Sequence, residues 1–180
     1  MISDKRILCV SSSGWEEPGE LPVICEMLSG ANNIIWINPF GRFNANLLPR
    51  IDRLKENLTV YYPGFNFLPL PFLGTFNRSR LLLHTKMYLL ERDFEPELVI
   101  FDHPELINFA AAFKKRGSQI LYYARTVEEE TITPGQKTAA RAVAQYVYKP
   151  RKAPYQIAEE DYLAFINDEV EAISKIMVNI

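Results

Sequence analysis

Five short apolar runs place the strongest limit on the fold of this chain. They are Arg6–Val10 (RILCV), Asn33–Ile37 (NIIWI), Leu58–Tyr62 (LTVYY), Leu98–Phe101 (LVIF) and Gln119–Tyr123 (QILYY). Each run is mostly apolar along its length, which is typical of strands buried on both faces of a parallel sheet. Helical patterns lie between the runs, so we expect an α/β fold with a doubly wound, Rossmann-like parallel sheet and helices on both faces.

The segments between these runs predict the helices that cover the sheet. Leu21–Leu28 has Gly30 as a stop signal, and Pro104 suits the first turn of a helix that Gly117 ends. The other predicted helices are Asn77 to about Arg92, Pro134–Tyr148 and Ala158–Ser174. Lys175–Ile180 (KIMVNI) predicts a further strand, for a total of about six.

The composition indicates one globular domain. The chain has 180 residues, of which 48% are apolar, and a formal net charge of -2. Such a balance provides no broad basic field, so we expect no nucleic-acid partner. Cys9 and Cys25 lie within apolar patterns and are predicted to be small buried hydrophobes. We see no secretory leader and no apolar run of about eighteen residues, which favours a cytoplasmic setting.

The loop after the first run has an unusual composition. In VSSSGWEEPGELP, the small residues Ser11, Ser12, Ser13 and Gly14 precede a single large aromatic residue, Trp15. Small residues let a ligand approach the backbone closely, and an indole ring can stack on a sugar or a base. The alternative is a plain turn in which the tryptophan packs as a lid over the core.

Two later loops carry the other candidate residues. Asp102 and His103 follow the fourth run. The histidine can act as an acid or base and Asp102 is expected to bind substrate, or else either residue caps the next helix. Arg125 follows the fifth run and suits a phosphate or a carboxylate. Glu128 and Glu129 can orient hydroxyl groups or form a solvated face.

Several common sites are missing from the sequence. It has neither the G-x-G-x-x-G fingerprint of dinucleotide-binding proteins nor the G-x-x-x-x-G-K-[ST] of P-loop ATPases. No spacing of its His, Cys, Asp and Glu residues suggests a closed metal site, and it lacks the G-x-S-x-G motif of serine hydrolases. We therefore expect this domain to hold no cofactor and no metal ion.

A proline-rich aromatic segment precedes a basic helix. Its aromatic residues are Phe65, Phe67, Phe72 and Phe76, and the basic residues that follow include Arg78, Arg80 and Lys86. Aromatic and basic side chains together favour contact with an anionic membrane surface. The alternative is a hydrophobic flap folded on the same domain.

The order of these segments resembles the N-terminal domain of GT-B glycosyltransferases, in the family 4-like group that builds bacterial surface polysaccharides. The similarity rests on the serine and tryptophan loop and on NIIWINPFGRF, RLKENLTVYYP, ELVIFDHPEL and QILYYARTVEE. It implies that the serine loop lies at the floor of a cleft between two Rossmann-like domains. Members often carry Tyr-Asp and paired aspartates after the fifth strand, where this chain has Tyr122-Tyr123 and then Glu128-Glu129.

The resemblance implies that residues 1–180 are a single acceptor-side domain, with the donor-binding C-terminal domain outside this chain. The full enzyme would move a sugar from a nucleotide-sugar co-substrate to a glycan or lipid-linked acceptor, with His103 and Ser11–Gly14 contributing from this side. The isolated domain would be inactive. It would be cytoplasmic, or peripheral at the inner face of the plasma membrane. The alternatives are a non-catalytic module that binds carbohydrate or a partner protein, and a small hydrolase or epimerase-like enzyme.

Overall fold

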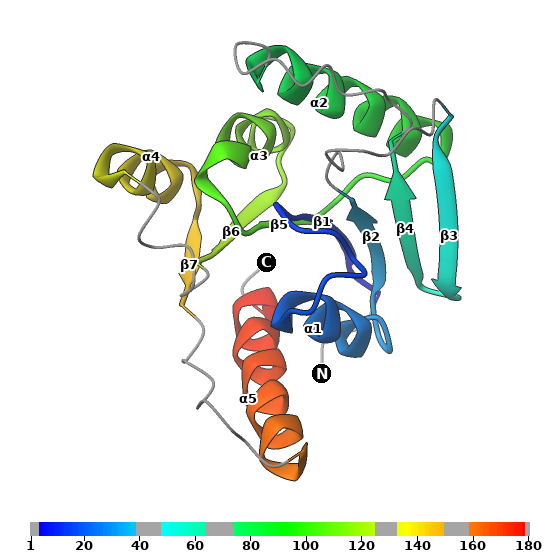
Figure 1. The fold of residues 1–180 in the computed structure, drawn as a ribbon, viewed down its shortest axis with the longest axis vertical. Helices are drawn as coiled ribbons and strands as arrows, with labels where there is room; N and C mark the ends of the chain where they lie inside the picture. The colour runs from blue at the N-terminus through cyan, green and yellow to red at the C-terminus, as the bar shows by residue number, and fades with distance from the viewer. Residues whose placement is uncertain (1–3, 39–47, 64–73, 125–132, 150–158, 179–180) are drawn as a thin grey trace.

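The computed structural model describes residues 4–38, 48–63, 74–124, 133–149 and 159–178. Within them lies a seven-stranded sheet of order β3-β4-β2-β1-β5-β6-β7 (Figure 1). The strands are β1 (Arg6–Val10), β2 (Asn33–Ile37), β3 (Arg50–Lys55), β4 (Leu58–Tyr62), β5 (Leu98–Phe101), β6 (Gln119–Tyr123) and β7 (Tyr146–Tyr148). All neighbouring strands are parallel except β3 and β4. The predicted doubly wound, Rossmann-like class is confirmed.

Helices cover both faces of the sheet. They are α1 (Glu20–Leu28), α2 (Gly74–Glu91), α3 (Ile107–Lys114), α4 (Pro134–Val143) and α5 (Glu159–Val178), with a 3-10 turn, η2, at Pro104–Leu106. Figure 1 shows α2, α3 and α4 on one side of the sheet and α1 and α5 on the other. No helix in the described part of the chain is long and apolar enough to cross a membrane.

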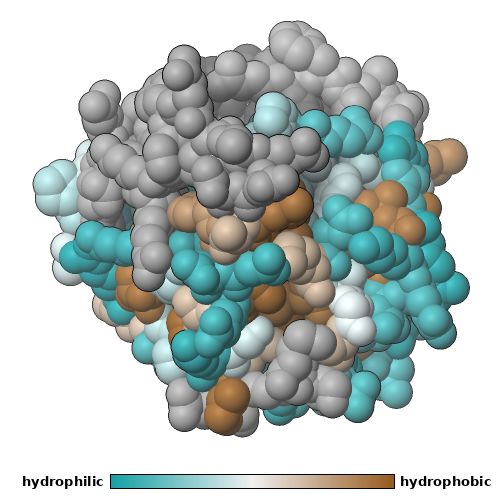
Figure 2. All heavy atoms as spheres, turned by 90° about the horizontal axis from the view of Figure 1, so that it is seen from below, coloured by the Kyte–Doolittle hydropathy of each residue, from teal (hydrophilic) through white to brown (hydrophobic). Residues whose placement is uncertain are grey.

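The apolar strands supply two separate cores because successive side chains point to opposite faces. Leu8 and Val10 of β1 join the cluster beneath α2, α3 and α4, whereas Ile7 and Cys9 join the cluster over α1 and α5. Cys25 of α1 belongs to the second cluster, and both cysteines are buried as predicted. Figure 2 shows the face seen from below, where apolar side chains gather centrally among hydrophilic ones.

Two edge elements differ from the sequence prediction. β3 was not predicted, because its residues alternate poorly and nearly all are exposed at the sheet edge. The predicted helix Pro134–Tyr148 ends at Val143, and Tyr146–Tyr148 instead pairs with β6 as β7. Aromatic and β-branched residues favour an extended strand there over a further helical turn.

The predicted strand Lys175–Ile180 is wrong. Residues 175–178 continue α5, and 179–180 lie outside the described residues. Ile166, Ile173 and Met177 are buried against the sheet at intervals of seven and four residues. This spacing keeps the three side chains on one helical face. The short apolar run KIMV was compatible with either periodicity, and packing against the sheet selects the helix.

Candidate functional site

The register of three adjacent strands builds the candidate site. Val10 of β1 lies opposite Ile37 of β2 and Phe101 of β5. The next residue on each strand, Ser11, Asn38 or Asp102, therefore lies at the same carboxyl edge of the sheet. Open parallel α/β sheets bind their ligands at this edge.

Asp102 joins the loop after β5 to the loop after β1. Its Oδ2 accepts a hydrogen bond of 2.5 Å from the Ser11 hydroxyl, and its Oδ1 accepts one of 2.7 Å from the Ser12 backbone N–H. Asp102 and Ser11 are each 1% exposed. A carboxylate so deeply buried needs such donors, so the pair fixes the geometry of the edge.

The three serines have different environments. The Ser13 backbone N–H donates to Ser11 Oγ at 3.1 Å, and the two hydroxyl oxygens are 3.2 Å apart. Ser12 is exposed, and its link to Asp102 uses its backbone rather than its hydroxyl. The predicted small-residue loop therefore has a structural serine at its base and an exposed serine that can contact a ligand.

Asn38 holds the tryptophan end of the loop. The Trp15 backbone N–H donates to Asn38 Oδ1 at 2.6 Å, and the Asn38 backbone N–H donates to the Tyr61 carbonyl at 2.9 Å. A Cβ added at Gly14 would lie 3.6 Å from Asn38 Oδ1 and 3.4 Å from Glu17 Oε1, which are ordinary contacts. Glycine is therefore not required there for space. Asn38 was missed in the sequence, although a polar residue directly after a buried strand was the available signal.

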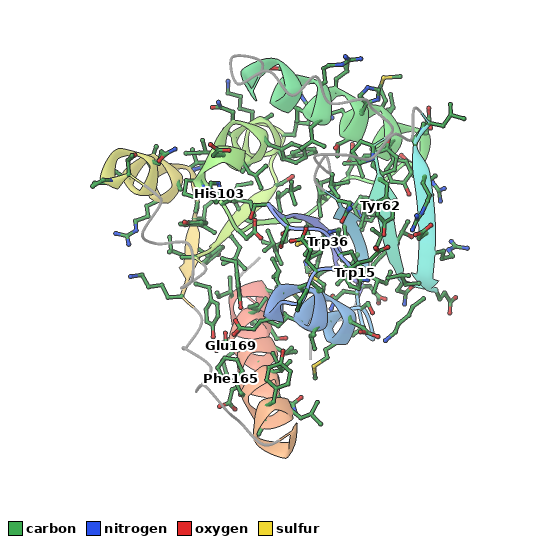
Figure 3. The ribbon with its side chains drawn as sticks, viewed as in Figure 1. Trp15, Trp36, Tyr62, His103, Phe165 and Glu169 are labelled. Atoms are coloured by element: carbon green, nitrogen blue, oxygen red, sulfur yellow. The ribbon has the colours of Figure 1, made fainter. Side chains whose placement is uncertain are left out.

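Trp15 packs on the core and remains partly exposed. Its ring meets the fully buried Trp36 edge to face, with centroids 5.1 Å apart and an interplanar angle of 81°. Figure 3 shows the two rings together and His103 apart from them. The geometry combines both sequence interpretations, because the indole covers the core and still presents apolar surface beside the serine loop.

His103 caps the helical segment that begins at Pro104. Its Nδ1 accepts a 3.2 Å hydrogen bond from the Glu105 backbone N–H. When Nδ1 accepts, the neutral imidazole carries its proton on Nε2, so this nitrogen acts as a donor. The cap predicted as an alternative is present, and the catalytic role stays a prediction.

A second polar link lies at the end of β6. The Tyr123 hydroxyl donates to Glu20 Oε2 of α1 at 3.1 Å. Burial, followed by the charge and hydrogen bond of Glu20 and the charge of Glu169, raises the pKa of Tyr123 well above that of an ordinary phenol. Glu169 of α5 is itself 1% exposed (Figure 3). The tyrosine therefore remains a neutral donor. The sequence did not reveal this pair because its residues are far apart in the chain.

Some predicted residues cannot be placed at this edge. Arg125, Glu128 and Glu129 lie outside the described residues. Among the residues that are described, no group of three or more His, Cys, Asp or Glu side chains is arranged to hold a metal ion.

The predicted membrane contact cannot be tested on most of its residues. Phe65, Phe67 and Phe72 lie outside the described residues, and the side chains of Phe76 and Arg78 are not described. Arg80 and Lys86 lie in α2 and are half-buried. The membrane contact therefore stays a prediction.

A cavity of about 280 Å³ lies at the opposite edge of the sheet. Its lining includes residues at or just before the starts of three strands, Arg6, Glu97 and Ser118. The cavity shares no lining residue with the serine loop, Asn38 or Asp102. We favour the carboxyl edge as the candidate site, because its loops bring buried polar groups from separate strands together.

Comparisons with known proteins identify the fold. No protein-family model and no curated protein matches the chain. The structure is similar to sucrose-phosphate synthase from Thermosynechococcus elongatus, with a TM-score of 0.57 and 9% identity over 79% of this chain and 42% of that one. A shorter piece of the same synthase gives a TM-score of 0.54 and 8% identity over 95% of this chain and 99% of that one. The E. coli trehalose-6-phosphate protein bound with UDP-2-fluoro glucose gives a TM-score of 0.50 and 17% identity over 89% of this chain and 42% of that one.

These similarities confirm the GT-B-type fold that the sequence resemblance implied. The chain spans 42% of the length of two of these proteins. At identities of 8% to 17%, the likeness concerns the fold and assigns no residue its role. The narrower family 4-like group has no support from these comparisons and stays a prediction.

Proposed function

We propose that this chain is the acceptor-binding side of a glycosyltransferase that uses a nucleotide-sugar donor. The observation that carries the proposal is the register of β1, β2 and β5. This register gathers the serine loop, Asn38 and Asp102 at the carboxyl edge of a fold shared with glycosyltransferases.

The edge offers groups suited to a sugar. The exposed Ser12 can exchange hydrogen bonds with sugar hydroxyls, and Trp15 supplies an apolar wall for a pyranose face. His103, with Nδ1 engaged by the Glu105 N–H, presents a donor nitrogen to an acceptor oxygen or to a developing charge. Asp102 and Asn38 are both buried and hold these loops in place, and the expected contact of Asp102 with substrate stays a prediction.

The donor would be held by a second domain across the cleft. Its diphosphate would leave as the acceptor oxygen attacks, and catalysis would come mostly from positioning and from stabilising that charge. The neighbour bound with UDP-2-fluoro glucose supports a nucleotide sugar as the donor class. Arg125, Glu128 and Glu129 are proposed to extend the acceptor side.

The proposed acceptor is a glycan or a lipid-linked sugar in bacterial polysaccharide synthesis. We place the reaction in the cytoplasm, or at the inner face of the plasma membrane. The 180 residues alone would bind the acceptor without transferring sugar, since the donor site would be outside them. A module that binds carbohydrate without turnover is the competing function.

Activity of the native protein, isolated with any domain that accompanies these residues, tests the proposal. Released nucleoside diphosphate is measured with a panel of nucleotide sugars and glycan or lipid-linked acceptors. His103→Asn keeps a side chain that can cap the helix but removes the imidazole, and His84→Ala on α2 is the matched control.

We expect His103→Asn to slow transfer by about a hundredfold while His84→Ala stays active. Full activity in His103→Asn would show that His103 caps the helical segment and has no catalytic role. Acceptor binding without transfer, with every donor in the panel, would favour the binding module.

A further inference from the structure

A tight turn carries Trp15 at the carboxyl edge. The Glu17 backbone N–H donates to the Gly14 carbonyl at 3.1 Å, and a bond between the first and fourth residues closes a β-turn. Trp15 and Glu16 are therefore the two central residues of this segment, here called the Trp15 turn (Gly14–Glu17). Asn38 holds the first of them through its backbone N–H. A contact that holds the second would also fix the direction in which the indole points.

Glu16 has such contacts with the two edge strands. The Tyr62 hydroxyl donates to Glu16 Oε1 at 3.3 Å, and Arg50 Nη2 forms an ion pair with the same oxygen at 3.6 Å. Arg50 and Tyr62 are opposite each other in the antiparallel pair of β3 and β4. Because β4 runs parallel beside β2, Tyr62 lies at the same edge of the sheet as Asn38. Two neighbouring strands therefore hold the two central residues of the Trp15 turn.

The groups that hold Glu16 are themselves oriented. Arg50 Nε donates to the Asp52 carboxylate at 2.9 Å, and the centre of the guanidinium lies 4.3 Å from the centroid of the Tyr62 ring. This distance is typical of a cation–π contact. Burial, followed by the charges of Glu16 and Asp52, raises the pKa of Tyr62, so its hydroxyl stays a neutral donor. Arg50 thus supports the tyrosine that reaches Glu16.

These contacts are too exposed to contribute much to global stability. The Arg50 and Glu16 side chains are 50% and 76% exposed, and Tyr62 is half-buried. Water and salt weaken ion pairs in such positions. Their effect is local instead, since they limit the movement of a short turn. Figure 3 shows Tyr62 and Trp15 toward the β4 side of the fold and His103 toward the opposite side.

We propose that Tyr62 is a positioning residue for the sugar acceptor, with Arg50 in support. Tyr62 acts through Glu16, which keeps the Trp15 turn in one orientation and so keeps the indole in place as the apolar wall of the site. The inference rests on the function proposed above for the carboxyl edge. A displaced wall weakens acceptor binding without disturbing the reacting atoms, so the expected effect is on KM rather than on kcat.

Amide hydrogen exchange tests whether Tyr62 holds the turn. Tyr62→Phe removes the hydroxyl and keeps the ring beside Arg50, whereas Glu16→Ala removes the acceptor that both groups share. Glu16→Gln is the conservative variant, because its amide oxygen can still accept from the Tyr62 hydroxyl. Tyr146→Phe changes another half-buried tyrosine that packs on the same core, and it is the matched control.

We expect the Glu17 amide, which closes the turn, to exchange about fivefold faster in Tyr62→Phe and Glu16→Ala. A fivefold change is equivalent to about 1 kcal/mol, the usual net contribution of one hydrogen bond. Exchange in Glu16→Gln and Tyr146→Phe should stay close to wild type. The Tm of every variant should fall by no more than about 2 °C, because exposed contacts contribute little.

Transfer by the native protein tests the consequence for the acceptor. The assay uses the nucleotide sugar and the acceptor that give the highest rate in the panel described above. Tyr62→Phe and Glu16→Ala should raise the KM for the acceptor about fivefold, while kcat and the KM for the donor stay near wild type. Glu16→Gln should restore most of the lost affinity, which a general loss of stability would not allow.

The outcomes separate this proposal from the proposed function. Unchanged exchange of the Glu17 amide in Tyr62→Phe would overturn the positioning role. So would faster exchange with an unchanged KM for the acceptor, although the proposed function would then stand. A fall in kcat alone would also overturn it, because a positioned wall affects binding. Absence of transfer with every donor and acceptor would overturn both.

Discussion

Removing the Ser11 hydroxyl tests how the carboxyl edge is held together. Ser11→Ala deletes the 2.5 Å hydrogen bond to Asp102 and the acceptor of the Ser13 N–H. A hydrogen bond to a charged group contributes about 1.5–3 kcal/mol, and both partners here are 1% exposed, so water cannot replace it readily. Asp102 keeps the Ser12 N–H. We therefore expect Ser11→Ala to lower the free energy of unfolding by about 2 kcal/mol.

Urea unfolding, followed by tryptophan fluorescence, measures this loss. For a chain of this size, a loss of about 2 kcal/mol corresponds to a fall in Tm of about 4–8 °C. Ser12→Ala is the matched control, because Ser12 reaches Asp102 through its backbone and its exposed hydroxyl can be removed at a cost below about 0.5 kcal/mol. Equal stability of the two variants would refute a stabilising hydrogen bond between Ser11 and Asp102.

A double-mutant cycle assigns the interaction to the pair. Ser11→Ala, Asp102→Asn and the double variant should show a coupling energy of about 1–2 kcal/mol, because contacting residues do not act additively. Additive losses would mean that each residue stabilises the edge through other contacts.

Three further predictions concern other contacts of the fold. Burial raises the pKa of the Glu97 carboxyl, but the hydrogen bond from Lys5 and nearby positive charge outweigh it, so the pKa is lowered. Wild type should therefore be more stable to unfolding than Glu97→Gln by less than about 1 kcal/mol, because the Lys5–Glu97 ion pair is partly exposed. This difference should be present above the usual glutamate pKa of about 4.3 and should vanish as the pH falls through the lower pKa of the folded state. A difference that grows in acid would contradict the lowered pKa. Trp15→Ala should cost about 1–2 kcal/mol in urea unfolding and shift Trp36 emission to the red, and an unchanged emission would show that Trp15 does not cover that ring. Asn38→Ala leaves the Trp15 N–H without its acceptor, so the hydrogen of that amide should exchange with solvent faster. An unchanged exchange rate would show that the 2.6 Å hydrogen bond does not hold the loop.

The central parallel strands were predictable because they are buried along most of their length. Runs such as Arg6–Val10 carry apolar residues toward both cores, so sequence and structure agree on their bounds. The edges were not predictable, since β3 is exposed and β7 has only three residues. At the C-terminal end, helical packing against the sheet decided between two periodicities that KIMV allows equally.

The candidate site was predictable in part for a related reason. Asp102 and the serines follow buried strands, and parallel pairing brings such positions together. Their hydrogen-bond partners depend on side-chain geometry that spacing does not contain. Asn38 carried the same signal as Asp102 and was overlooked. The Tyr123–Glu20 contact joins a strand end to a helix start across the fold, so no local pattern marks it.

Nuclear magnetic resonance titration with saccharides and sugar phosphates gives the sharpest test of sugar binding at the carboxyl edge. We expect a bound sugar to shift the Trp15 indole, the Ser12 and Asn38 amides and the His103 ring together. Shifts confined to the cavity at the opposite edge of the sheet, beside Arg6 and Ser118, would contradict the assignment of the site. So would a compound that binds without shifting the Trp15 indole signal.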